Sequence, residues 1–379
     1  MSVETLPGDG RARTQATARA LIDADTHPFT AHRFGEYLPK RWSSYIDVYG
    51  RRNLHNRGVT PPQRPYAARL DAAPPQGGAP GSDPAFAREQ LLDLYGLTYA
   101  MLNSLDQIAL GNAPVELEVA MARASNEIIR ELWLESDPRW IAAISIPQEH
   151  PREAVAEIER CLASGSRWVQ VLFGSRLERP LGNPKYWPIF EAAEAAGIPI
   201  ATHVGTSKYH YQTGVGPPSF YFEAHGGYPT PGQANVASLI FEGVFDRFPN
   251  LRVMLAEQGW EWVVPYAWRL DATWRVQRSE VPDLKREPSS YFREHFYFTT
   301  QPAVETEVPR DISRVYRQLE EAGFGEHLLF SSDYPHWDMD SPLAAIPSSL
   351  DDDLRHRVLA GNAAALYGLE LPSDPAAQE

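Results

Sequence analysis

From residue 20 onward, short apolar runs alternate with longer amphipathic segments. Each short run has the length of a strand and is apolar at most positions, as expected for parallel strands buried on both faces. There are eight such runs, at 20–25, 98–103, 140–146, 168–173, 198–203, 251–257, 295–300 and 327–333. Between them apolar residues recur every three or four positions, which predicts helices. The clearest predicted helices cover 114–136, 151–164, 183–197 and 234–248.

Eight strand–helix units in sequence order predict an α/β protein with a (β/α)8 TIM barrel. A doubly wound open sheet is the alternative, because the number of strands does not show whether the sheet closes. The barrel is expected to cover residues 20–370. Residues 1–19 lack the apolar core of a secretory signal and are expected to form a flexible arm, and 371–379 a C-terminal tail.

Two segments interrupt the regular spacing and predict long loop insertions after the first and fifth strands. Residues 28–84 are rich in Pro and Gly, and residues 204–232 are rich in aromatic side chains. Both follow predicted strands, so on a barrel they would cover the face that carries catalysis. The aromatic residues of the second segment favour a lid over the site; they include Tyr209, Tyr211, Tyr221 and Phe222.

Composition narrows the classes of function. With 43% apolar residues, the 379-residue chain can bury a sizeable core. A net charge of -14 argues against nucleic acid or an anionic membrane as partner, and no apolar run reaches the roughly 18 residues of a membrane span. Cys161 is the single cysteine, which excludes an internal disulfide and fits a cytoplasmic location. A small-molecule substrate is therefore expected, and homo-oligomer formation stays open.

Metal-binding side chains stand where predicted strands end. Asp23, Asp25 and His27 alternate at the end of the first strand, so they share one face. His203 ends the fifth strand and Asp333 the eighth. In a barrel, these strand ends meet at one mouth although they lie far apart in the sequence.

Two imidazoles and two carboxylates form a ligand set for one Zn²⁺ or Mn²⁺ ion. The ion would offset the repulsion between the carboxylates, and one coordination position would remain open. A lone histidine or Asp-x-Asp-x-His string is usually structural, but the joint placement at three strand ends favours a metal site. The strand-1 carboxylate ligand could be Asp25 or Asp23.

The chain resembles the amidohydrolase superfamily over about residues 20 to 370. The resemblance includes the strand-1 motif, "FSSDYPHWD" at 330–338 and "LAGNAAALYGL" at 359–369. It is closest to the amidohydrolase-related branch that includes aminocarboxymuconate-semialdehyde decarboxylase and gamma-resorcylate decarboxylase. That branch has His-x-His or Glu-x-His on strand 1. The resemblance therefore implies that the metal ligands are Asp25, His27, His203 and Asp333.

Two positions depart from the family pattern. The strand-4 lysine and strand-6 histidine that hold a second metal are missing, since strand 4 ends in "VLFGSR" and Glu257 stands at the histidine position. The resemblance therefore implies a site with one metal ion. Without the strand-6 histidine, acid–base chemistry could fall to Glu257, His225 or His336.

Three functions remain open at this point. The first, and the one that the sequence favours, is a hydrolase in which metal-activated water attacks the substrate and Asp333 acts as both ligand and general base. The second is a non-oxidative decarboxylase of an aromatic or unsaturated acid, and the third is a non-catalytic ligand-binding barrel. The substrate is expected to be aromatic or carboxylated, with Arg176, Tyr221 and Trp260 as its contacts.

Overall fold

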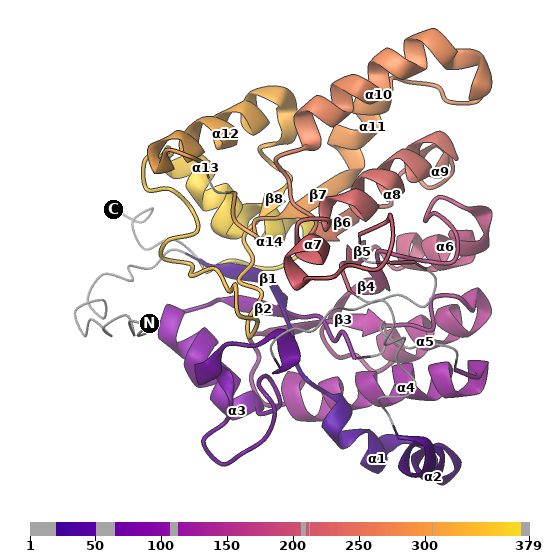
Figure 1. Ribbon diagram of the computed structural model, residues 1–379, viewed down its shortest axis with the longest axis vertical. Coiled ribbons are helices and arrows are strands. Elements are labelled where there is room, and N and C mark those ends of the chain that lie inside the picture. Colours follow the sequence, from indigo (N-terminus) through magenta and orange to yellow (C-terminus); the bar gives the residue numbers. More distant parts are fainter. Residues whose placement is uncertain are drawn as a thin grey trace.

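The computed structural model describes residues 20–50, 65–106, 113–205, 210–211, 213–304 and 306–372. Eight parallel strands form one sheet in sequence order, with helices packed around it (Figure 1). The strands are β1 Ile22–Thr26, β2 Tyr99–Leu102, β3 Trp140–Ser145, β4 Trp168–Gly174, β5 Ile200–His203, β6 Val253–Ala256, β7 Phe296–Thr299 and β8 Leu328–Leu329. Each corresponds to one of the eight predicted runs. The predicted arm, and the tail from residue 373, lie outside the described residues.

Helices follow the strands as the sequence predicts. Three of the four clearest predicted helices are present, and the fourth, at 234–248, is divided into two helices at Gly243, whose φ of 70° is left-handed and ends the first helix. The α-helices are α1 Phe34–Tyr37, α2 Lys40–Tyr49, α3 Pro84–Ala87, α4 Val115–Ile128, α5 Pro151–Ala163, α6 Trp187–Ala195, α7 Tyr221–His225, α8 Pro229–Phe241, α9 Val244–Arg247, α10 Val263–Gln277, α11 Pro288–His295, α12 Ile312–Leu319, α13 Asp352–His356 and α14 Asn362–Tyr367. Segments of π-helix continue four of them, at Arg88–Asp93, Ile129–Leu134, Glu320–Phe324 and Arg357–Gly361.

The sheet closes on itself between β1 and the end of β8. The Ala24 amide donates to the Phe330 carbonyl at 2.9 Å, and the Asp333 amide donates to the Asp25 carbonyl at 3.0 Å. Thr26 and Tyr334 form a parallel bridge beyond the end of β8. The TIM-barrel prediction is therefore confirmed, and closure sets the first and last strand ends side by side.

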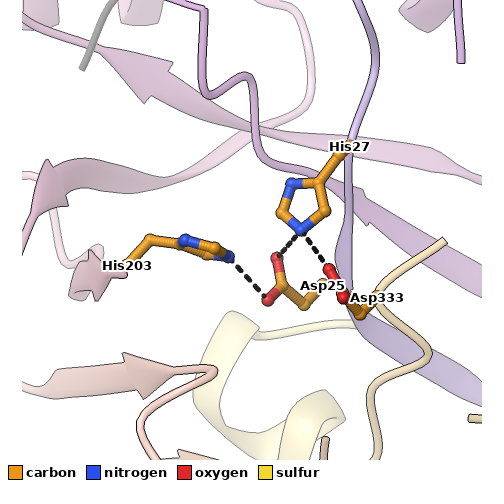
Figure 2. A group of neighbouring side chains, drawn as sticks. All are labelled: Asp25, His27, His203 and Asp333. Carbon is orange, nitrogen blue, oxygen red and sulfur yellow. Dashed lines mark hydrogen bonds and ion pairs between the residues drawn. The ribbon is translucent and has the colours of Figure 1, made fainter. Parts of the chain in front are cut away.

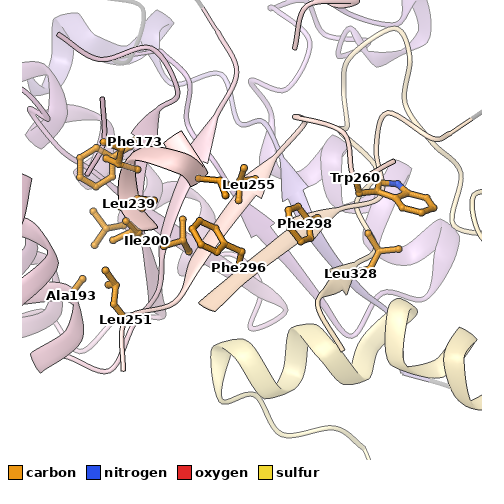
Figure 3. Close-up of a cluster of buried hydrophobic side chains, with 14 of the residues drawn as sticks. Phe173, Ala193, Ile200, Leu239, Leu251, Leu255, Trp260, Phe296, Phe298 and Leu328 are labelled. Atoms are coloured by element: carbon orange, nitrogen blue, oxygen red, sulfur yellow. The ribbon is translucent and has the colours of Figure 1, made fainter. Parts of the chain in front are cut away.

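Alternate residues of each strand face opposite sides. One set packs outward against the helices, where Phe173 and Ile200 meet Leu239 of α8 (Figure 3). The other set points into the barrel. Contacts between side chains of strands that are not neighbours show this orientation. Gln170 of β4, for example, donates to Asn103 beyond β2 at 2.8 Å. This inward set continues to the strand ends and supplies the candidate site.

The long segment after β1 is partly helical. Phe34 of α1 and Trp42 of α2 form an apolar cluster with Leu117 and Met121 of α4, so this part of the segment packs on the barrel's helical layer. Residues 51–64 and 206–209, including Tyr209, lie outside the described residues. The lid therefore stays a prediction.

Candidate metal centre

Four buried side chains meet at the barrel mouth: Asp25, His27, His203 and Asp333 (Figure 2). One ligand atom of each lies within 4.8 Å of the others. The His27 Nε2 atom lies 2.7 Å from Asp333 Oδ1, and the His203 Nε2 atom lies 3.2 Å from Asp25 Oδ2. Two ligands on a metal at about 2.1 Å are themselves about 3 to 3.5 Å apart, so these separations suit a shared ion.

Both imidazoles present the same nitrogen to the cluster. His27 Nδ1 lies 2.9 Å from the Asn103 carbonyl oxygen, and His203 Nδ1 lies 2.6 Å from the Val204 carbonyl oxygen. A carbonyl oxygen can only accept a hydrogen bond, so each Nδ1 carries the hydrogen. Each Nε2 is then free to offer its lone pair, which is how metal-binding histidines are usually oriented.

The protein's own charges alternate within the cluster. Burial by itself lowers an imidazole pKa, but Asp25 and Asp333 outweigh it and raise the pKa of His27 to about 9. Burial also opposes ionisation of Asp25, yet His203 and His27 hold the pKa of its carboxyl below the usual range. Without a metal, the imidazoles of His27 and His203 are thus disposed to hold protons that face the carboxylates. A divalent cation would take the place of those protons.

Two polar atoms of the cluster support this fit. Asp333 Oδ2 is buried and has no hydrogen-bond partner among the described residues, and the buried His27 Nε2 atom has only its ion-pair contacts with Asp25 Oδ1 and Asp333 Oδ1. Buried polar atoms are rarely left in this state, because the loss of hydration is costly. A cation bound between them would satisfy both atoms. The cluster is therefore consistent with one divalent metal ion.

A chain of buried amides supports Asp25 from inside the barrel. Asn103 Nδ2 donates to Asp25 Oδ1 at 2.7 Å, Gln170 Nε2 donates to Asn103 Oδ1, and the Tyr367 hydroxyl donates to Gln170 Oε1 at 3.0 Å. These residues were not singled out from the sequence. Asn103 ends the predicted strand at 98–103 just as His203 ends the one at 198–203, so its position in the sequence could have marked it as a candidate site residue. Gln170 is hidden within an apolar run.

The structure distinguishes the two strand-1 carboxylates. Asp23 lies two residues deeper in the barrel, about 7 Å along the strand. Its Oδ1 accepts hydrogen bonds from the Ser332 amide at 2.9 Å and the Asp25 amide at 3.2 Å, and burial raises the pKa of its carboxyl to about 7. Asp25 is the carboxylate within the cluster, and Asp23 ties β1 to the segment before Asp333.

The three candidate acid–base residues all lie near the cluster. Glu257 Oε2 is 3.5 Å from His203 Nε2, and His336 Nδ1 is 2.6 Å from Asp333 Oδ1. Burial and the Asp333 charge raise the pKa of Glu257 well above its ordinary value. His225 belongs to a neighbouring group with Glu257 and Asp338. Asp338 was not identified from the sequence, although it lies within the quoted "FSSDYPHWD" motif.

The predicted substrate contacts occupy three different environments. Arg176 is buried, donates to the Gly205 carbonyl at 3.1 Å, and lines a cavity of about 360 Å³. The Tyr221 hydroxyl lies 3.4 Å from that of Tyr228, whose ring packs on His225. Trp260 is 1% exposed and packs on Tyr316 in the hydrophobic core (Figure 3). The structure therefore does not bring Trp260 together with the cluster.

We expect one tightly bound divalent metal ion per chain after exhaustive dialysis, because one buried cluster offers four ligand atoms. Elemental analysis of protein made in medium supplemented with Zn²⁺ or Mn²⁺ measures this. Two retained ions per chain would contradict the single tight site. Protein that retains none under either metal would remove the basis for the ligand assignment.

A closed (β/α)8 barrel with a buried cluster of metal-binding side chains at its mouth is the architecture of a metal-dependent enzyme. The amidohydrolase family model matches residues 22–369, and the chain belongs to that family. Gamma-resorcylate decarboxylase of Polaromonas sp. strain JS666 is 26% identical over 305 residues, which cover 74% of this chain and 86% of the relative. The 2-amino-3-carboxymuconate-6-semialdehyde decarboxylase of Dictyostelium discoideum is 29% identical over 145 residues, 37% of this chain and 38% of the relative.

Solved structures share the fold. The 5-carboxyvanillate decarboxylase LigW from Sphingomonas paucimobilis superimposes with a TM-score of 0.67 at 22% identity, covering 93% of this chain and 100% of the other. A dihydroxybenzoic acid decarboxylase from Polaromonas sp. JS666, solved with manganese and the inhibitor 2-nitroresorcinol, gives 0.62 at 19% identity, with coverage of 94% and 99%. In the described part of this chain, no helix has the length and apolar character needed to cross a membrane.

Proposed function

We propose that this protein is a metal-dependent decarboxylase that releases the carboxyl group of an aromatic or unsaturated acid as CO₂ without oxidation. The observation that carries the proposal is the buried four-residue cluster in a chain whose curated relatives are decarboxylases. The sequence alone favoured hydrolysis. The relatives support the decarboxylase alternative better, because decarboxylation is the activity in their names.

The reaction exchanges a carboxylate for a hydrogen at one carbon. A proton adds to the carbon that bears the carboxylate, the carbon–carbon bond breaks, and its electron pair restores the unsaturated system as CO₂ leaves. A divalent ion, when bound, would supply positive charge for the anionic oxygens of the substrate. The protein must hold the ion, orient the carboxylate and deliver the proton.

Asp333 and Glu257 are the groups placed to handle that proton. Asp333 lies between His27 and His336, and these imidazoles hold the pKa of its carboxyl below the usual range although burial opposes this. Glu257 is buried with its Oε2 atom 3.5 Å from His203 Nε2, and burial and the Asp333 charge raise the pKa of its carboxyl. Asp333 is thus held ionised, as a metal ligand must be, and would carry a proton only transiently, whereas Glu257 is disposed to hold a proton; such a division between two carboxyl groups is common in acid–base catalysis.

Arg176 is the proposed contact for the substrate carboxylate. Burial lowers its pKa to about 10, so it remains protonated at neutral pH. Tyr228 lies near Arg176 on one side and near Glu257 and Asp333 on the other. An aromatic acid lying between Arg176 and the cluster would meet the rings of Tyr221 and Tyr228. This arrangement supports a flat, carboxylated substrate.

The reaction is tested with a panel of aromatic acids that includes 2,6-dihydroxybenzoate and 5-carboxyvanillate. We expect CO₂ release in equal amount to the product. In D₂O the product should carry one deuterium at the carbon that lost the carboxylate. The metal-free protein is the control and should be inactive.

Hydrolysis predicts a different isotope pattern. In H₂¹⁸O, turnover of an ester, lactone or amide panel would place ¹⁸O in the acid product and release no CO₂. That result, together with no CO₂ from the aromatic acids, would contradict the proposed decarboxylase.

A further inference from the structure

A second group of metal-binding side chains lies beside the first. It consists of His225 at the end of α7, Glu257 after β6 and Asp338 after β8, and one ligand atom of each lies within 4.8 Å of the others. His225 Nε2 is 2.8 Å from Asp338 Oδ2. Asp338 Oδ2 also accepts from Gln301 Nε2 at 3.1 Å, which limits how far the carboxylate can turn.

Glu257 joins the two groups and lacks a secure partner. It is only 5% exposed, and within the described part of the chain no hydrogen bond reaches its carboxylate. Its one ion-pair contact there is His203 Nε2, at 3.5 Å. If His203 binds metal through Nε2 while Nδ1–H donates to Val204, it has no hydrogen left for Glu257. The buried carboxyl group of Glu257 must then either keep a proton or contact another positive charge.

The carboxyl groups at the barrel mouth also favour additional positive charge. Four carboxyl groups converge there, and for all four to be ionised the mouth needs more positive charge than one divalent ion carries. Burying a negative charge without compensation is costly, because the charge loses its hydration. The four are Asp25, Glu257, Asp333 and Asp338.

We infer that His225, Glu257 and Asp338 bind a second divalent cation, with Glu257 placed between the two ions. Two carboxylates and an imidazole suit Mn²⁺, which accepts both oxygen and nitrogen ligands. The family's second metal depends on a strand-4 lysine and a strand-6 histidine, and this group uses neither. Glu257 stands at the position of that histidine, whereas His225 and Asp338 come from the segments after β5 and β8, so the ligand set differs from the one that is missing.

The second site should be the weaker one. The side chains of His225 and Asp338 are 20% and 14% exposed, whereas those of His27 and His203 are 5% and 0% exposed. A more hydrated site gains less from each ligand, because water competes for the ion. Three protein ligands also leave positions for water or for an anionic oxygen of a substrate.

The test is a calorimetric titration of Mn²⁺ into dialysed protein that retains its tight ion, with no substrate present. We expect one additional Mn²⁺ per chain, bound at least tenfold more weakly than the tight ion. Glu257→Gln and Asp338→Asn should each weaken this additional binding at least tenfold. In both variants elemental analysis should still find the tight ion at one per chain.

Glu261→Gln is the matched control, because Glu261 is an exposed carboxylate four residues after Glu257 and lies outside both groups. It should leave the additional binding unchanged. The inference is overturned if no additional Mn²⁺ binds, or if the binding is unaffected by Glu257→Gln and Asp338→Asn. Loss of the tight ion in Asp338→Asn would also overturn it, since the two groups would then form one site. Failure of the proposed reaction leaves this result untouched, because the titration uses the metal alone.

Discussion

Asp333→Asn should lose turnover by about 10² to 10⁴, the usual contribution of positioned acid–base catalysis, while the fold and much of the metal remain. This loss corresponds to about 3 to 5 kcal/mol of barrier. Asparagine keeps one oxygen that can face the metal but cannot accept a proton at neutral pH. Turnover and metal content are measured on the same purified variant, so a lost ligand and a lost proton carrier can be told apart.

An exposed position offers the matched control for this exchange. The Asp353 side chain is 79% exposed and pairs with Arg357 on the helical layer, so Asp353→Asn should keep full turnover. Near-normal turnover in Asp333→Asn would contradict the assigned role. His336, whose Nδ1 lies 2.6 Å from Asp333 Oδ1, would then be the next group to replace.

His203→Ala should lose the tight metal and turnover together, each by at least about tenfold. Its imidazole is fully buried at the end of β5, and its orientation is set by the hydrogen bond from Nδ1–H to the Val204 carbonyl. Water in the space left by the ring has no such anchor, so it cannot restore the ligand. Elemental analysis and turnover of the variant measure the two losses.

His327→Ala is the control for removing an imidazole. His327 precedes β8, at the opposite end of the strand from Asp333, and its ring packs on Tyr297 at 4.8 Å. Its replacement should retain one metal ion per chain. A His203→Ala protein with full metal content would show that His203 is not a ligand.

The sequence was sufficient to predict the strands, because parallel strands in a barrel are buried on both faces. Strands buried on both faces appear as nearly continuous apolar runs, and all eight runs form strands. The sequence also predicted members of the metal-binding cluster, since His203 and Asp333 are metal-binding residue types at the ends of such runs. In a closed barrel every strand ends at the same mouth, so the order of residues in the chain predicts their meeting point.

Other members of the site gave no comparable signal. Gln170 is a single polar residue within an apolar strand, and its partner Asn103 becomes evident only when β2 and β4, on either side of β3, both direct side chains into the barrel. The group of His225, Glu257 and Asp338 comes from three separate segments beyond the strands. The path of such segments depends on packing, which the local hydrophobic pattern does not encode.

The sequence by itself determined the eight strands, their order and the set of residue types at their ends. Only the tertiary structure decided that Asp25 rather than Asp23 joins the cluster, that Arg176 is buried beside a cavity and that Trp260 belongs to the core. The physical reason is that strand periodicity fixes which face a side chain occupies, whereas its depth in the barrel and its neighbours depend on closure between β1 and β8.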